Sequence, residues 1–316
     1  EASFNEAAFG GGARFIRATF GEGADFLTAA LHGGASFYRA KFERRCAFAG
    51  RRPTPEDQPE DQAEYPLFFP SGEIDFRNVQ IEEPRKFQFR HVNLSRVSFL
   101  GTDLRGVDFL DCRFARWKGR KALYDEETHC RTGKPPETLE TNLRLTQSLY
   151  QQLKRNFEEN RDFAQAGAFH FGEMEMRRLQ VPGYRRWLSV LQWYKWASGY
   201  GEYYRRAFWV FLGIVLVFTL AFSFSPNVIG QKKDQNFAGL PSVVEVSGNW
   251  EKAGRVWDSF VYSFRAASLL RALPSAPGAE IYPASRWGVA LAVPLSVLGP
   301  VQLALFFLAL RRHVRR

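Results

Sequence analysis

The chain has 316 residues, 30 of them phenylalanine, with a net charge of +10 and a mean hydropathy of −0.30. Two uncharged apolar runs, 207–224 and 287–310, are each long enough to cross a membrane, which argues against a purely soluble protein. The segments 177–206 and 311–316, which adjoin these runs, carry +6 and +4 and so account for the whole charge excess. A nucleic-acid binder would spread its basic residues over a folded face, so this placement instead fits the positive-inside rule for membrane helices.

Residues 1–50 repeat one large apolar side chain at alternating intervals of five and six residues. The repeated residues are Phe4, Phe9, Phe15, Phe20, Phe26, Leu31, Phe37, Phe42 and Phe48. An alanine or a cysteine stands two positions before each of them. Neither a helix nor a flat strand has this period. The pattern predicts a narrow solenoid in which each large side chain stacks on its counterpart in the next coil and the small residue fills the remaining space.

The pattern resumes in 73–118, after a segment (51–72) rich in proline and acidic residues that we expect to be a linker or a disordered insertion. Here the large residues recur every five positions, at Phe89, Leu94, Phe99, Leu104, Phe109 and Phe114. This arrangement resembles the pentapeptide-repeat family. The resemblance implies a right-handed quadrilateral β-helix over residues 1–118 and implies no catalysis. Some family members imitate DNA with acidic surfaces, but both segments are nearly neutral, and we expect no contact with nucleic acid.

From 137 to 180 the apolar spacing becomes helical, with a break at 160–162, and predicts a hairpin similar to a tetratricopeptide repeat. Its second helix contains His170, Glu173 and Glu175, which are either metal ligands or partners of Arg177 and Arg178; we favour ion pairing. No motif of a nucleophilic, phosphate-binding or metalloprotease site occurs in the chain. We therefore expect no enzyme activity, no catalytic residue, no cofactor and no bound metal.

The remaining sequence predicts a membrane part with both termini on the cytoplasmic side of the cell inner (plasma) membrane. Aromatic and basic residues alternate before the first apolar run and predict an amphipathic helix at the lipid headgroups. The predicted parts are an interfacial helix (181–206), a first transmembrane helix (207–225), an extracytoplasmic loop (226–286), a second transmembrane helix (287–310) and a basic tail (311–316).

Within the loop, 257–273 predicts a short helix that cannot span a membrane. The chain thus has a first span, a short re-entrant helix and a second span. This order of elements is similar to that of two-span, tetrameric potassium channels. The positions that match the pore lining and filter of such channels are Arg265, Ser268, Arg271, Pro274, Ser275, Pro277, Gly278 and Glu280. They lack the paired glycines of a potassium filter, so we expect no potassium selectivity and leave the permeant ion open.

A hinge is predicted in the second span. Pro294 and the pair Gly299–Pro300 interrupt the helical hydrogen bonding, and Gln302 follows as an amide within an apolar run. Gln302 either faces a wet lumen or bonds a neighbouring helix.

Two functions remain open from the sequence. The first is an oligomeric membrane channel, tetrameric by resemblance, whose cytoplasmic repeat domain senses a partner or orders the assembly. The alternative is a non-conducting, membrane-tethered scaffold for protein–protein interaction. Both imply a lipid bilayer as a partner, and both allow a cytoplasmic protein partner on the repeats.

Overall fold

The computed structural model describes residues 2–31, 33–50, 73–132, 136–224, 229–232, 249–268, 280–283 and 286–315. The chain divides into two compact units, Glu1–Gln192 (unit 1) and Trp193–Arg315 (unit 2). The linker predicted at 51–72 lies outside the described residues.

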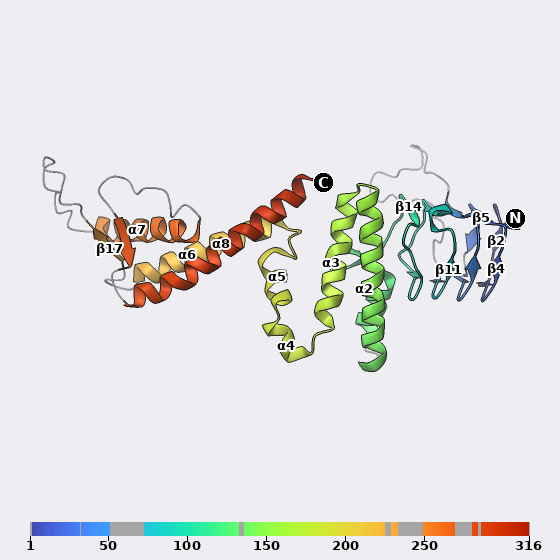
Figure 1. The fold of residues 1–316 in the computed structure, drawn as a ribbon, viewed down its shortest axis with the longest axis horizontal. Coiled ribbons are helices and arrows are strands. Elements are labelled where there is room, and N and C mark those ends of the chain that lie inside the picture. Colours follow the sequence, from blue (N-terminus) through green and yellow to red (C-terminus); the bar gives the residue numbers. More distant parts are fainter. Residues whose placement is uncertain are drawn as a thin grey trace. The chain divides into compact units, whose positions relative to one another are not determined.

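Unit 1 begins with short strands that lie in four parallel sheets (Figure 1). One sheet contains β1 (Ala2–Ser3), β5 (Ala24–Leu27), β9 (Cys46–Ala49), β12 (Phe87–Arg90) and β14 (Asp108–Leu110). The second contains β3 (Ala13–Arg14), β7 (Ala35–Ser36), β10 (Ile74–Asp75) and β13 (Val97–Ser98). The third contains β4 (Thr19–Phe20), β8 (Lys41–Phe42) and β11 (Gln80–Ile81), and the fourth β2 (Ala8–Phe9) and β6 (Ala30–Leu31). From β1 to β4 the chain visits each sheet once, and β5 returns to the first.

The register of the strands follows the sequence period. Ala2 pairs with Ala24 and Ala24 with Cys46, a return after 22 residues, which is four intervals of alternating five and six. Phe89 pairs with Phe109, a return after 20 residues, which is four intervals of five. The pentapeptide-type segment of the chain thus forms stacked parallel strands; we call the described residues of 2–50 and 73–118 the repeat coil.

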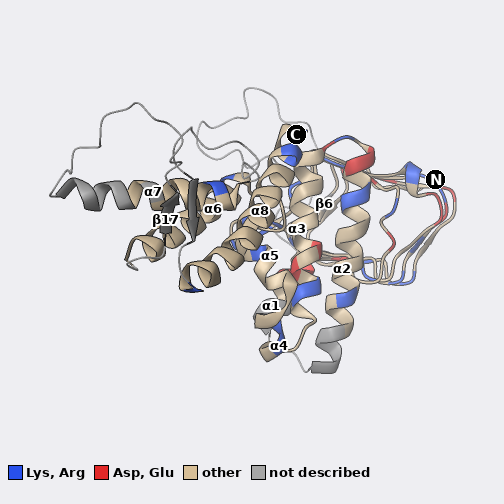
Figure 2. Ribbon diagram, turned by 60° about the vertical axis from the view of Figure 1, so that its left-hand side comes forward, with Lys and Arg blue, Asp and Glu red and all other residues tan. Residues whose placement is uncertain are grey.

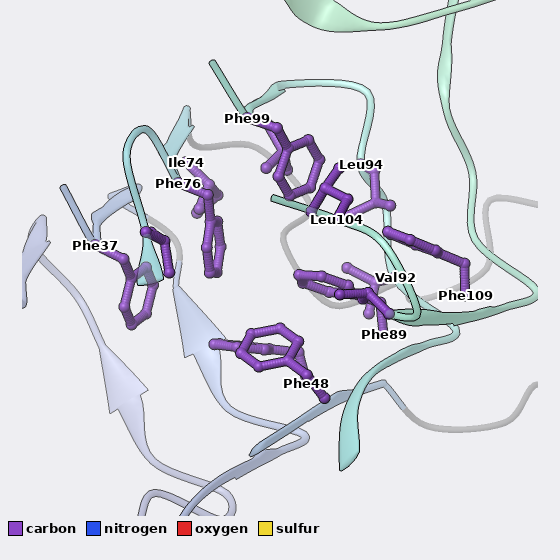
Figure 3. Packing of buried hydrophobic residues seen from close by; sticks show 14 of the residues in the cluster. Phe37, Phe48, Ile74, Phe76, Phe89, Val92, Leu94, Phe99, Leu104 and Phe109 are labelled. Atoms are coloured by element: carbon purple, nitrogen blue, oxygen red, sulfur yellow. The ribbon is translucent and has the colours of Figure 1, made fainter. Parts of the chain in front are cut away.

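The large apolar residues of the repeats stack in the interior of the repeat coil (Figure 3). Ring centroids of Phe26 lie 4.7 Å from those of both Phe4 and Phe48, with nearly parallel planes. The same stacking joins Phe37 to Phe76 at 4.7 Å. Of the predicted core residues, Phe4, Phe9 and Phe15 are partly buried and the others are buried. These ring contacts stabilise the coil in addition to the stabilisation that comes from burying its apolar surface.

A helical cap closes the last coil of unit 1. After the hairpin β15 (Ala115–Trp117) and β16 (Arg120–Ala122) come α1 (Tyr124–Thr132), α2 (Pro136–Glu159) and α3 (Phe163–Leu179), with α2 and α3 side by side in Figure 1. The Asn156 side chain of α2 donates to the carbonyls of Leu104 and Val107 and accepts from the amide of Gly106. Phe157 and Phe169 continue the ring stack beyond Phe114. The helical pair predicted at 137–180 therefore covers the end of the coil and satisfies backbone groups that would otherwise lack partners.

The segment predicted as one interfacial helix, 181–206, has a different structure. It forms α4 (Gly183–Leu188) and α5 (Val190–Ser198), separated by Ser189, and then a turn before the next helix. Ser189 has an extended backbone (ψ 135°), which interrupts the helix. Aromatic and apolar side chains of these two helices are largely exposed, among them Tyr184, Trp187, Leu188 and Val190.

Beyond the end of α5, the described residues of unit 2 form three helices and one small hairpin. The helices are α6 (Tyr204–Phe224), α7 (Asn249–Ala267) and α8 (Arg286–Val314), and the antiparallel strands are β17 (Ile229–Lys232) and β18 (Glu280–Pro283). Helices α6 and α8 are long and apolar enough to cross a membrane, which indicates membrane association. Basic residues lie at the C-terminal end of α8 and are absent from its apolar stretch (Figure 2).

Helix α7 begins and ends earlier than predicted, at Asn249 and Ala267 rather than at 257 and 273. The added first turns include Glu251 and Lys252, charged residues that conceal the helical pattern in the sequence. The helix packs against both α6 and α8.

Candidate functional site

A groove crosses the outer face of the sheet formed by β3, β7, β10 and β13. Its floor is a ladder of outward side chains in register, Arg14, Ser36, Asp75 and Ser98. They point outward because the preceding residue of each strand is a small or apolar core residue, and side chains alternate along a strand. The cavity has a volume of about 460 Å³, within the range of natural ligand sites.

One rim of the groove is built of glycines. Gly12, Gly33 and Gly34 lie along it, and Gly34 has a φ of 82°. A Cβ atom on Gly34 would lie 2.6 Å from the carbonyl oxygen of Glu73 on the next coil. Glycine is therefore required for the coils to approach each other here, and no side chain projects from this rim at Gly12, Gly33 and Gly34.

Helix α1 closes one end of the groove. The Tyr124 hydroxyl donates to Glu73 Oε1 at 2.6 Å. The Asp125 carboxylate accepts from the Ser98 hydroxyl and, at 3.0 Å, from the Phe99 amide. These contacts fasten α1 to β13 and leave a recess with one closed end.

The groove presents charges of both signs. Arg77 donates twice to Asp75, with N···O distances of 2.8 and 2.7 Å, and these hydrogen bonds raise the pKa of Arg77. Arg14 is exposed at the open end. Serine and tyrosine hydroxyls lie between the charged groups. This mixture of donors and acceptors allows the groove to hydrogen-bond a polar, extended ligand.

The buried Asp125 makes the attachment of α1 dependent on pH. Burial raises the pKa of Asp125 to about 6, although the hydrogen bonds from Ser98 and Phe99 lower it. An unfolded aspartate titrates near ~3.9. Between these values the folded chain binds a proton that the unfolded chain does not bind. Stability from this group is therefore present at low pH and is lost as the pH rises through about 6.

Replacement of Asp125 by asparagine is expected to remove this dependence, because asparagine keeps the shape and carries no charge. Relative to the parent chain, the variant should gain on the order of 2–3 kcal/mol in unfolding free energy when the pH is raised from about 4 to about 7.5. Urea titrations at each pH, monitored by amide exchange in unit 1, measure the unfolding free energies of the variant and the parent. If the two chains differ by the same free energy at both pH values, Asp125 is ionised in the folded as well as in the unfolded chain.

The glutamates of the predicted cluster at His170, Glu173 and Glu175 contact basic side chains. His170 Nδ1 lies 3.7 Å and Lys154 Nζ 3.5 Å from the Glu173 carboxylate, which also accepts from Gln151. These partners outweigh burial and lower the pKa of Glu173 to about 2. Glu175 pairs with Arg178 at 2.6 Å.

The residues predicted to line a pore fall in several places. Ser268 follows α7 and is buried, and its hydroxyl donates to the Phe264 carbonyl at 2.6 Å. Arg265 lies in the last turn of α7. Glu280 is the first residue of β18, and the backbone register of the hairpin places it opposite Lys232 of β17. The others lie outside the described residues: Arg271, Pro274, Ser275, Pro277 and Gly278.

All the predicted hinge residues lie within α8. Pro294 and Pro300 are inside the helix, and Gly299 is buried against α7, where a Cβ atom would lie 2.4 Å from Ala267 Cα. Gln302 is buried and donates from Nε2 to the carbonyls of Ala197 and Ala207, both at 2.9 Å. Of the two alternatives for Gln302, the structure has the bond to neighbouring backbone.

The sequence did not point to the groove. Its floor residues occupy outward repeat positions, which tolerate many residue types, and α1 was not predicted. The signal that was present is the cluster of glycines at positions 10–12 and 33–34, which have the spacing of one coil.

A family model for pentapeptide repeats, in eight copies, matches residues 86–116. This match confirms the repeats within the second predicted segment, 73–118. No curated protein and no solved structure matches the chain. The resemblance of the membrane part to two-span channels therefore rests on the sequence pattern alone.

Proposed function

We propose that the chain is a membrane-anchored pentapeptide-repeat scaffold whose repeat coil docks an extended segment of another protein. The groove on the β3–β7–β10–β13 face carries this proposal. It is as long as four stacked strands, roughly 15 Å at the usual strand spacing, and is closed at one end by α1. Its alternating charges and hydroxyls can bond a peptide backbone and polar side chains.

The proposed coil is the closed, right-handed quadrilateral β-helix of the pentapeptide-repeat family. Support comes from the four parallel sheets, the return after 22 or 20 residues and the family match at 86–116. In such a rod every face is available for docking while the core stays constant.

The proposed anchor consists of α6 and α8, which cross the inner (plasma) membrane and leave both termini in the cytoplasm. The basic residues Arg205 and Arg206 precede the apolar part of α6, and Arg311, Arg312 and Arg315 follow that of α8. Positive charge at these two ends favours their retention on the cytoplasmic side.

Photo-cross-linking tests the docking role. Benzoylphenylalanine in place of Ser36, on the groove floor, should give a discrete cross-linked product with a second protein in native membranes. The same residue in place of Gln88, which is outward on a different sheet, is the matched control and should give none. The absence of a product from position 36, or equal products from both positions, would contradict docking in the groove.

One observation favours a second candidate, an oligomeric pore that is not potassium-selective. The C-terminal end of α7 lies beside Gly299, about 20 Å along α8 from Arg286. Helix α7 thus packs against both apolar helices and ends partway along α8. A re-entrant pore helix in the predicted tetrameric layout would need such contacts with both spans, and this need is what supports the second candidate.

Conductance recordings in planar bilayers test the pore. The expected result is a conductance that Pro300→Ala changes, since that substitution restores a helical hydrogen-bond donor. Gly299 is left unchanged because any side chain there would collide with Ala267. A silent bilayer under all conditions would reject the pore and leave the scaffold untouched.

A further inference from the structure

The turn between α5 and α6 has an unusual backbone. Gly199, Tyr200 and Gly201 have successive positive φ angles of 57°, 60° and 76°. Tyr200 is fully buried, and a residue with a side chain rarely adopts this conformation unless its surroundings impose it. We call Ser198–Tyr203 the α5–α6 turn.

The first contact that holds this region comes from Gln302. Its single amide nitrogen donates to Ala197 O at the end of α5 and to Ala207 O at the start of α6. One side chain of α8 thus fixes the helices on both sides of the turn. A buried amide in an apolar helix is costly without such partners, so the contact is strongly favoured.

The second contact comes from Arg312, about 15 Å further along α8. Its Nη1 donates to the Tyr200 carbonyl at 3.2 Å and to Glu202 Oε1 at 3.0 Å. The Glu202 side chain is only 6% exposed, so the ion pair is largely shielded on that side. Gly201 is packed so closely that a Cβ atom would lie 2.9 Å from Leu308 of α8.

The first half of α8 also contacts α7. Ala292 and Leu295 pack in one apolar cluster with α6 and α7, which Leu303 joins at its edge, and Gly299 contacts Ala267 of α7. Helix α6 packs against both halves, since its Phe208 ring also meets Phe306. Pro300 follows Gly299 immediately and has no amide hydrogen, so the helix resists bending least between the two sets of contacts.

We propose that α8 consists of two separately anchored halves and that its C-terminal half, from Val301 to Val314, moves as one body with the α5–α6 turn. Helix α5 contains the junction between unit 1 and unit 2. A change in the orientation of α5 is then transmitted through Glu202–Arg312 and Gln302 to the end of α8. This device rests on the helix contacts and is independent of whether the helices conduct.

Amide hydrogen exchange of the full chain in lipid nanodiscs tests the coupling. The amides of Gly199, Tyr200, Glu202 and Tyr203 are all hydrogen-bonded and should be protected in the parent chain. Arg312→Gln should speed their exchange on the order of tenfold or more, because a charge-assisted bond is lost. Exchange in α8 from residue 302 onward should accelerate in parallel, whereas α7 should keep its protection.

Arg311→Gln is the matched control, since Arg311 is the exposed neighbour of Arg312 and loses the same charge. It should leave exchange in the turn unchanged. Glu202→Gln should reproduce the effect of Arg312→Gln, and the double variant should add little. Unchanged exchange in Arg312→Gln, an equal effect of Arg311→Gln, or equal loosening of α7 would overturn the two-body description of α8.

Discussion

Replacement of Phe26 by alanine is expected to destabilise unit 1 by about 3–5 kcal/mol. Its ring is fully buried between those of Phe4 and Phe48 and meets Phe15 and Phe37 edge-on. The backbone ladders above and below hold the coil at a fixed width, so the walls cannot collapse into the cavity left by the ring. Amide exchange of the strand residues in the full chain measures the loss of stability.

Arg44 provides the control for this prediction. It lies exposed between β8 and β9, and its replacement by glutamine should change the unfolding free energy by less than about 0.5 kcal/mol. Similar losses at positions 26 and 44 would mean that the ring stack is not the core of unit 1.

Replacement of Arg120 by methionine is expected to cost about 3–5 kcal/mol. Arg120 pairs with Glu126, whose other oxygen accepts from the Tyr150 hydroxyl, and the Glu126 side chain is 1% exposed. Burial lowers the pKa of Arg120, but the adjacent Glu126 outweighs burial and raises it. Methionine fills a similar volume yet leaves the carboxylate buried without its cation, so the charge, rather than a cavity, causes the loss.

The additional substitution Glu126→Gln distinguishes charge from packing. The double variant Arg120→Met with Glu126→Gln should recover part of the stability lost in the single variant, because no uncompensated charge remains. Urea titrations of the full chain, followed by exchange in α1 and α2, provide the comparison. A double variant less stable than Arg120→Met alone would contradict this account of the cap.

The repeat period, together with the four-sided coil that the pentapeptide resemblance implies, was sufficient to predict the strand registers, because one large residue must occupy the same place in every turn of a narrow coil. Intervals of five and six add to the 22-residue return between Ala2 and Ala24. The positions of the two apolar helices also follow from composition alone, since an uncharged apolar run of roughly 18 or more residues is typical of a membrane-spanning helix.

Contacts between distant segments could not be predicted in this way. The cap depends on Asn156 of α2 reaching the backbone at Leu104 and Val107, and nothing in a local period marks that pairing. The break at Ser189 was hidden because the aromatic residues on both sides continue the amphipathic pattern. Gln302 was recognised as a polar residue that needs a partner, but its two acceptors are backbone carbonyls, which every residue possesses.

Cysteine labelling in intact cells tests most directly the central claim that two spans hold the repeat coil on the cytoplasmic face of a membrane. A membrane-impermeant maleimide should modify Gly239→Cys, between the apolar helices, without permeabilisation. Arg44→Cys in the coil and Val314→Cys at the end of α8 should react only after permeabilisation. Labelling of either of these from outside, or recovery of the intact chain in the soluble fraction, would contradict the account.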